Sequence, residues 1–576
     1  MSRQPWHTKE LKQRQLTSNT AENPVAYGAL SPDGRTLAVL DEGGLSLRSI
    51  DSGESSALRI PEGFTLAGYP FVLISWFPDG SRLLLSGRSS DGKPYVWALP
   101  VLGGRARKLI VGGEFATISR DGKHLAFVRA GKEGNDLWCS GAQGEDPRPI
   151  VSSDSSGSIS LWGVWSPNGH RLMYERITAN ARGFNAYLES CDLGGHRRVA
   201  FAADGGQNLH SATVPLWLPD GRLLFGLSDP PPSQAELNLW SLHVDPASGA
   251  PSGKPRRITQ WQRVSLVAAT GVSTDGRRLS LGLLSYQSDC FIGEIAPGST
   301  ILSSPRRLTM DDRFDLQPSW TSDGKAILFA SDRNGTMDIF RQALDATEAE
   351  PLVSGEGDQM APCTSPDGAW ILYKDGGAGP VIRGGGSARI MRIPSSGGPP
   401  EKVLDTQAIA AFRCAKHAGT PCVLGELTGD HMVFTGFDPV RGRGPQLARV
   451  RVDGPEPWDL SPDGTKLAVM DKQDSLPRIR VVPLHGGPAH EVRLDRRIGI
   501  TNVAWAADGS RWMVVGNLQK SEKGGWRMLR VEPGGRTSEM LPPQMWMYSA
   551  AASADGRHVV YTSNTIDSNI WLLENF

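Results

Sequence analysis

Short apolar runs alternate with polar turns along the whole chain. Each run has three to five residues, too few for a helix, and most runs are rich in residues that favour β-strands. The clearest runs are residues 37–40, 83–85, 125–128, 223–225, 326–330, 371–373, 467–470 and 559–561. The pattern therefore predicts an all-β protein built from many short, buried strands.

The turns before these runs share one sequence mark, Ser-Pro-Asp-Gly or a close variant. Proline presets the backbone at the second turn position, aspartate bonds its own backbone, and glycine accepts a positive φ. The marks end at Gly34, Gly80, Gly122, Gly169, Gly221, Gly276, Gly324, Gly368, Gly464, Gly509 and Gly556. They recur about every 47 residues, with one gap of about twice that length before Gly464, which predicts twelve units.

The unit at residues 304–348 shows the repeat most clearly. Residues 304–309 form one short segment, and the segments 317–320, 326–330 and 338–340 follow with polar turns between them. Four short strands per repeat of this length are typical of a β-propeller blade. A tryptophan often precedes the turn and another aromatic residue recurs on the third strand, where both would fill the space between blades. We therefore predict a structural role for nearly all repeated residues.

Twelve blades exceed the roughly four to eight that one propeller ring holds. We expect tandem β-propellers, two six-bladed rings of four-stranded blades, with domains at residues 1–300 and 301–576. Strand 13–17 would complete the blade of Gly276, and strand 304–309 the blade of Gly556, because ring closure protects sheet edges. In two alternatives, strand 13–17 pairs with the last blade and ties the rings together, or all blades form one large ring.

Three features of the repeat resemble a known family. The repeated Ser-Pro-Asp-Gly turns, Arg-Arg-Leu-Thr at 306–309 and Ser-Asp-Arg-Asn-Gly at 331–335 resemble the TolB-type, WD40-like β-propeller repeat. Residues 15–19 and 563–576 look like the sensor portions that acidobacteria attach to serine/threonine kinases or winged-helix regulators. The resemblance covers essentially the whole chain and implies a bacterial signalling sensor domain. The kinase, the winged helix and the membrane helix are absent from this sequence.

Composition and sequence segments limit which kinds of partner and which compartments are expected. The 576 residues carry a formal net charge of +0 and no basic blocks, which argues against a nucleic-acid partner. No window approaches the roughly 18 apolar residues of a spanning helix. Residues 1–12 lack a signal-peptide pattern, so the chain as written is expected in the cytoplasm. The resemblance instead implies a periplasmic or other extracytoplasmic location. An incomplete N-terminus would reconcile this location with the missing signal-peptide pattern.

Two cysteines form the only specific covalent candidate. Cys414 and Cys422 lie eight residues apart with a Gly-Thr-Pro turn between them, so they could face each other across a hairpin. A disulfide requires an oxidising compartment, and free buried thiols are the alternative. Together with His417 and His431 the pair could also nominally bind zinc, although the spacing matches no familiar zinc pattern closely. Cys139 and Cys290 are expected to be small buried hydrophobic residues.

Carboxylates outside the turns gather at Asp311, Asp312 and Asp315. They precede a first strand, where propellers place an open face, so a calcium or substrate role is conceivable, but a solvated loop is the favoured interpretation. His-Glu-x-x-His, Gly-x-Ser-x-Gly and the kinase signatures are absent. We therefore predict no catalytic residue, no cofactor and no metal.

The sequence favours a non-catalytic sensor or interaction module. It would bind a protein or a small ligand on a propeller face or in the cleft between rings, as a detached part of a signalling protein. The alternative is a hydrolase or lyase, which predicts converging Asp, Glu, His or Arg side chains in one channel. A third hypothesis is an intracellular assembly scaffold.

Overall fold

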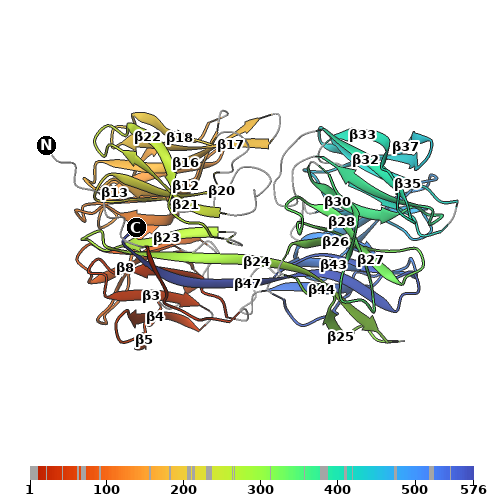
Figure 1. Cartoon of the computed structure of the whole chain (residues 1–576), viewed down its shortest axis with the longest axis horizontal. Helices are drawn as coiled ribbons and strands as arrows, with labels where there is room; N and C mark the ends of the chain where they lie inside the picture. Colours follow the sequence, from red (N-terminus) through yellow and green to blue (C-terminus); the bar gives the residue numbers. More distant parts are fainter. Residues whose placement is uncertain are drawn as a thin grey trace. The chain divides into compact units, whose positions relative to one another are not determined.

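The computed structural model describes most of the chain: residues 11–20, 23–41, 43–60, 64–65, 73–89, 93–154, 157–180, 183–203, 209, 215–228, 237–261, 264, 266–296, 298–311, 313–355, 357–376, 387–407, 411–417, 419–471, 476–517, 525–544 and 546–576. Within these ranges the regular structure consists of strands, β1 to β47, and includes no helix (Figure 1). Accordingly, no described helix is long and apolar enough to cross a membrane. The prediction of an all-β fold is confirmed.

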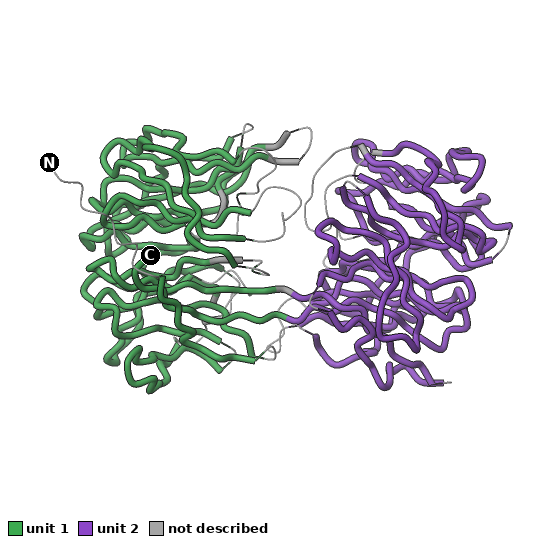
Figure 2. Tube along the Cα trace, in the orientation of Figure 1, with its two compact units in different colours: residues 1–180, 184–286, 566–576 green, residues 181–183, 287–565 purple. Residues whose placement is uncertain are grey.

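The strands fall into two units (Figure 2). Unit 1 comprises Met1–Asn180, Phe184–Tyr286 and Ile566–Phe576, whereas Gln287–Thr565 belongs to unit 2. The units are therefore not two consecutive halves of the sequence, because the C-terminal residues return to unit 1.

Unit 1 contains antiparallel strands that pair mainly with their neighbours in the chain. They are β1 (Lys12–Gln15), β2 (Tyr27–Leu30), β3 (Thr36–Asp41), β4 (Gly44–Ser49), β5 (Ser55–Ala57), β6 (Phe64–Thr65), β7 (Ile74–Trp76), β8 (Arg82–Ser89), β9 (Pro94–Pro100), β10 (Arg107–Val111), β11 (Glu114–Ile118), β12 (His124–Ala130), β13 (Asn135–Gly141), β14 (Arg148–Val151), β15 (Ser158–Trp165), β16 (Arg171–Asn180), β17 (Gly183–Asp192), β18 (Arg197–Ala202), β19 (Leu216–Trp217), β20 (Arg222–Ser228), β21 (Leu237–Val244), β22 (Pro251–Arg257) and β23 (Leu266–Val272).

Unit 2 contains five regular four-stranded sheets. Their strands are β26 (Asp315–Trp320), β27 (Ala326–Ser331), β28 (Asp338–Ala343) and β29 (Glu350–Val353); β30 (Gln359–Thr364), β31 (Trp370–Asp375), β32 (Ser387–Pro394) and β33 (Glu401–Gln407); β34 (Ala411–Cys414), β35 (Cys422–Thr428), β36 (His431–Asp438) and β37 (Gly442–Arg451); β38 (Trp458–Leu460), β39 (Lys466–Asp471), β40 (Arg478–Pro483) and β41 (His490–Arg493); and β42 (Gly499–Trp505), β43 (Trp512–Asn517), β44 (Trp526–Val531) and β45 (Thr537–Glu539). The sheet of β34 to β37 is the unit without the turn mark, and it keeps all four strands.

Two long strands, β24 (Arg278–Ile295) and β47 (His558–Glu574), belong to both units. With β1, β23, β25 (Leu302–Arg307) and β46 (Trp546–Ala552) they form a six-stranded sheet. In unit 1, Arg278 Nε of β24 lies 3.2 Å from Glu574 Oε1 of β47. In unit 2, the rings of Phe291 of β24 and Tyr561 of β47 stack with centroids 5.5 Å apart. Each long strand therefore supplies a second strand to one unit and a third strand to the other.

The lone strand at the N-terminus pairs with the last strand of the chain. Arg14 of β1 lies opposite Leu572 of β47, in the sheet that also holds the hairpin of Gly276. In the same manner β25 pairs with β24, with Arg306 opposite Ile292, beside the hairpin of Gly556. The N-terminal strand thus lies in the sheet of the Gly276 hairpin, but its partner is the last strand of the chain, as in the alternative that ties the rings together and not as in two separately closed rings.

The first strand of each set contacts the first strand of the next set. In unit 2 these contacts run from β26 through β30, β34, β38, β42 and β46 and return to β26. In unit 1 they run from β2 through β7, β11, β15 and β19, while β23 contacts β20 and β2. We interpret each cycle as a six-bladed ring. We call the six first strands of unit 2 its innermost strands, and the axis that they enclose its channel.

The repeated residues have the structural roles that their chemistry favours. In the first turn, Asp33 Oδ1 accepts hydrogen bonds from Ser31 Oγ at 2.5 Å and from the Arg35 amide at 3.0 Å, and Gly34 has a φ of 71°. The Trp76 indole donates to the Ala29 carbonyl of the neighbouring set at 2.8 Å, and the Trp320 indole donates to the Ala551 carbonyl at 3.0 Å. These tryptophans therefore join neighbouring blades.

Candidate functional site

Asp315, the first residue of β26, does not lie in a solvated loop. Asp315 is fully buried, and Arg333 Nη2 lies 3.0 Å from Asp315 Oδ1 and 2.6 Å from Asp311 Oδ2. Burial raises the pKa of Asp315 to about 6, although Arg333 acts in the opposite direction. The solvated-loop interpretation is therefore wrong for Asp315, while Asp312 lies outside the described residues.

A second buried carboxylate belongs to the same cluster. Asp289 of β24 is fully buried, and its Oδ1 lies 2.8 Å from Arg307 Nη2 and accepts a 3.4 Å hydrogen bond from Thr309 Oγ1. Burial raises the pKa of Asp289 to about 7, against the attraction of Arg307. Among the described residues no group of three or more His, Cys, Asp or Glu is arranged to hold a metal ion. This cluster joins β24, β25 and β26 within unit 2, so we assign it a structural role.

Cys414 and Cys422 lie opposite each other on β34 and β35. The structure joins them in a disulfide with their Cα atoms 4.0 Å apart. The nearby histidines make other contacts: His431 Nδ1 lies 2.6 Å from Asp430 Oδ1, and His417 is exposed. The redox state of the pair in the native protein stays a prediction, which thiol counting tests.

Side chains alternate along the innermost strands of unit 2, as the two-residue period of a strand requires. Buried residues such as Trp320 and Trp458 face neighbouring blades, and partly exposed residues lie between them. The partly exposed set consists of Gln317, Ser319, Cys363, Arg413, Asp459, Asn502 and Ser549. We infer that this polar set lines the channel.

Ionisable groups from different strands lie close together at one end of the channel. Arg413 Nε of β34 lies 3.4 Å from Asp459 Oδ1 of β38, and Asp459 Oδ2 accepts a 2.8 Å hydrogen bond from the Trp505 amide of β42. Lys416 Nζ donates to the Ala552 carbonyl of β46 at 2.6 Å. Strands β34 and β46 are three positions apart in the six-strand cycle, so the Lys416 side chain crosses the axis.

The hydrogen bond to Ala552 on the opposite side of the ring places Lys416 inside the channel. The side chain is exposed to solvent, yet desolvation by surrounding protein lowers its pKa. A flat surface would give exposure without desolvation, so we attribute the combination to a concave, solvent-reached position. Cys363 of β30 shares this place: it is half-buried, desolvation raises the pKa of its thiol, and Arg413 and Lys416 act in the opposite direction.

Desolvation is also the largest influence on the pKa of Asp459. It raises the pKa of this carboxyl, while Arg413 and Lys416 counteract the shift. We call Cys363, Arg413, Lys416 and Asp459 the channel cluster. A group of two cations, one carboxylate and one thiol in a confined space can hold an oxyanion or position a polar ligand.

Sequence reasoning missed the channel cluster. Its members lie 96 positions apart in the chain, from Cys363 to Asp459, and three different innermost strands carry them. One signal was present: Lys416 stands where half of the units carry the proline of the turn mark, in the unit that lost the mark.

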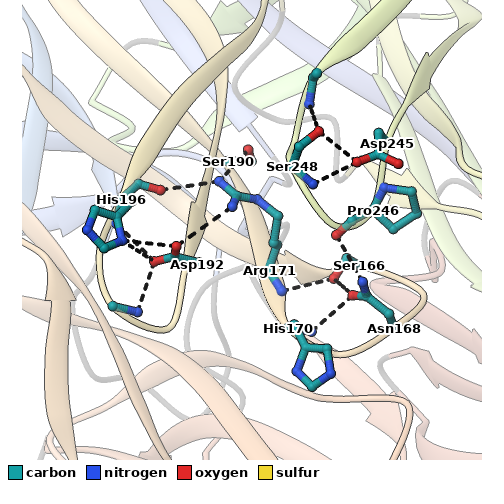
Figure 3. A network of polar contacts seen from close by, with 12 residues as sticks. Ser166, Asn168, His170, Arg171, Ser190, Asp192, His196, Asp245, Pro246 and Ser248 are labelled. Atoms are coloured by element: carbon teal, nitrogen blue, oxygen red, sulfur yellow. Dashed lines mark hydrogen bonds and ion pairs between the residues drawn. The ribbon is translucent and has the colours of Figure 1, made fainter.

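Unit 1 has a polar network of a different kind (Figure 3). Arg171 of β16 is buried, and its Nη2 donates to Ser190 Oγ at 3.3 Å and to the His196 carbonyl at 3.2 Å. Asn168 Nδ2 donates to the Pro246 carbonyl of the next blade at 3.2 Å. The network holds turns of two neighbouring sets together, so we assign it a structural role.

Comparisons with known proteins give distant similarities. No family model matches the chain. It is 29% identical over 229 residues to an uncharacterized protein of Agrobacterium fabrum, which covers 39% of this chain and 66% of the relative. It is 29% identical over 125 residues to the Tol-Pal system protein TolB of Wolinella succinogenes, which covers 21% of this chain and 27% of that protein. The chain therefore spans less than two thirds of either relative.

Solved structures also give only distant similarities. TolB from Acinetobacter baumannii aligns with 72% of this chain and 81% of its own at 15% identity and a TM-score of 0.33. An oligogalacturonate lyase in complex with manganese aligns with 82% and 97% at 13% identity and a TM-score of 0.26. At TM-scores this low, neither alignment carries an argument about this chain.

Proposed function

We propose that this protein is a non-catalytic interaction module whose binding site is the channel of unit 2. The observation that carries the proposal is the convergence of Arg413, Lys416 and Asp459 at the channel axis. Strands of a propeller hold such side chains rigidly, so a ligand would meet groups that are already in place. Desolvation strengthens their charge–charge interactions relative to those in bulk water.

The alternative function, a hydrolase or lyase, also draws on converging charged groups. The hydrogen bonding of Asp459 favours binding over catalysis. Both carboxylate oxygens already have a partner within the protein, Arg413 for one and the Trp505 amide for the other. An arginine-paired carboxylate is suited to hold Arg413 in position.

We extend the proposal to a sensor role in a signalling protein, with a protein or a small molecule as the bound partner. The repeat resemblance supports this finer statement, and the channel supplies the site. Neither a nucleic acid nor a membrane segment enters the proposal, since the net charge is +0 and the described chain has no spanning helix.

Site-specific photo-crosslinking tests the proposal. A photoreactive residue replaces His417, which is exposed beside Lys416, and a control chain carries it at His490 on the outer strand β41. Each purified chain is irradiated in native extract, and bound species are identified by mass spectrometry. We expect a species that couples at position 417, fails to couple at 490 and is lost in Lys416→Met. Equal coupling at both positions would overturn the channel as the binding site.

A further inference from the structure

We infer that the channel cluster of unit 2 binds an oxyanion, a carboxylate or phosphate group, through Lys416 and Arg413. This inference deepens the proposed function and rests on it. It names the chemistry of the group that enters the channel.

When Arg413, Lys416 and Asp459 are all ionised, the cluster has one positive charge in excess. Arg413 and Asp459 form an ion pair, and the remaining oxygen of Asp459 accepts the Trp505 amide. Lys416 Nζ donates to the Ala552 carbonyl, which is a neutral group. The ammonium charge is therefore balanced by a hydrogen bond and not by a second carboxylate.

Two further polar groups on the innermost strands are compatible with an anion. The Cys363 thiol stays neutral at pH 7, because burial raises its pKa. Ser319 of the innermost strand β26 has a buried hydroxyl oxygen without a hydrogen-bond partner. Lysine binds phosphate and carboxylate as a point charge, and a charged hydrogen bond is stronger in a confined, desolvated place. An incoming oxyanion would thus take the place of the Ala552 carbonyl on Lys416.

Unit 1 carries a cation at the corresponding place. Arg120 follows β11 at the proline position of its turn, and its Nη2 donates to the Trp217 carbonyl at 3.4 Å. Desolvation lowers the pKa of Arg120, and no charged group contributes to that shift. This second cation gives a matched control, because its removal changes the net charge equally and leaves the Cys363 site intact.

Cys363 supplies the readout. It is half-buried, whereas the other free cysteines, Cys139, Cys191 and Cys290, are 4%, 0% and 0% exposed, so alkylation of the native protein reports on Cys363. The experiment compares the rates of anionic iodoacetate and neutral iodoacetamide, with the modified peptide identified by mass spectrometry. The Cys363 thiolate attacks the CH2 carbon of either reagent and displaces iodide, so the ratio of the two rates cancels the thiol pKa and measures the local charge.

If the cluster is an anion site, the ratio of the two alkylation rates at Cys363 should differ between the variants in a specific way. The iodoacetate-to-iodoacetamide ratio at Cys363 should exceed that of the unfolded chain by roughly threefold to tenfold. Lys416→Met should remove most of this excess, while Arg120→Met and the surface variant Lys402→Met should keep it. Inorganic phosphate and acetate, added separately at constant ionic strength, should each slow iodoacetate, and the stronger inhibitor identifies a phosphate or a carboxylate as the preferred group.

Three results would overturn the inference: a ratio equal to that of the unfolded chain, an equal loss in Arg120→Met, or no reaction with either reagent in the folded protein. The last result would show that small anions do not reach the cluster. Failure here leaves the photo-crosslinking experiment intact, because a neutral or cationic ligand could still couple at position 417.

Discussion

Arg120 and Lys416 occupy the same place in the two units. Each follows the first strand of the third blade of its unit, and each donates a hydrogen bond to a backbone carbonyl of a non-neighbouring blade, at Trp217 and Ala552 respectively. In both positions a long cationic side chain replaces the proline of the turn mark. The two rings therefore share a feature that the repeat itself does not require.

These cations should add little to stability. A hydrogen bond contributes about 1 kcal/mol net, and desolvation of a cation offsets that gain. We expect Arg120→Met and Lys416→Met each to change the free energy of unfolding by no more than about 1 kcal/mol, as measured by urea denaturation. A loss of several kcal/mol in either variant would show that the cation holds its ring together, and would favour a structural role.

The contribution of two buried aspartates to stability should fall as the pH rises from about 4 to about 7. Asp289 has its pKa raised to about 7 and Asp315 to about 6, whereas an unfolded aspartate titrates near 4. Between these values the folded state keeps protons that the unfolded state has lost, so the contribution is fully present below about pH 4 and is lost as pH passes the folded pKa.

The variant Asp289→Asn tests whether the contribution of Asp289 to stability falls as the pH rises. Asn238 and Asn569 hold the equivalent place in two other blades, where the amide oxygen accepts the bonds of Thr259 and Thr17 at 3.1 Å and 2.9 Å. We therefore expect the asparagine to fit. The free energy of unfolding of the variant, relative to the wild type, should increase between about pH 4 and pH 8 by about 1.4 kcal/mol for each unit of pKa difference. A difference that is constant with pH would contradict the raised pKa.

The disulfide should stabilise unit 2 modestly. It joins residues with a sequence separation of 8, and closure of so short a loop contributes about 2.5 kcal/mol. The double variant Cys414→Ser/Cys422→Ser should lose about this amount in chemical denaturation, whereas Cys363→Ser should lose less. Thiol counting on denatured, unreduced protein should give the four free cysteines, Cys139, Cys191, Cys290 and Cys363. A count of all 6 cysteines as thiols would contradict the disulfide.

A glycine beside the polar network of unit 1 should resist substitution. Gly249 has a φ of 71°, and an added Cβ would collide with Ser190 Oγ and with Arg171 Nε. Gly253 has a φ of 78° with open space around it, which makes it a matched control. Both alanine variants should incur about 1 kcal/mol for the backbone, and Gly249→Ala should lose clearly more in thermal denaturation. Equal losses would show that the network adapts to the methyl group.

The amino-acid sequence alone determined the repeat and the class of fold. The turn marks, the short apolar runs and the aromatic positions are local, so each unit could be recognised by itself. The unit without a mark was placed from its spacing, and β34 to β37 form its four strands. Cys414 and Cys422 could be paired because a short hairpin brings them together.

Only the tertiary structure decided how blades are completed and where charges meet. The exchange of third strands through β24 and β47 depends on pairing between residues hundreds of positions apart, as Arg278 and Glu574 show, and no local pattern encodes it. The channel cluster exists because ring closure brings Cys363, Lys416 and Asp459 together at one axis. Asp315 was misjudged as solvated for the same reason: its burial comes from Arg333 and β24, which approach it only in the folded sheet.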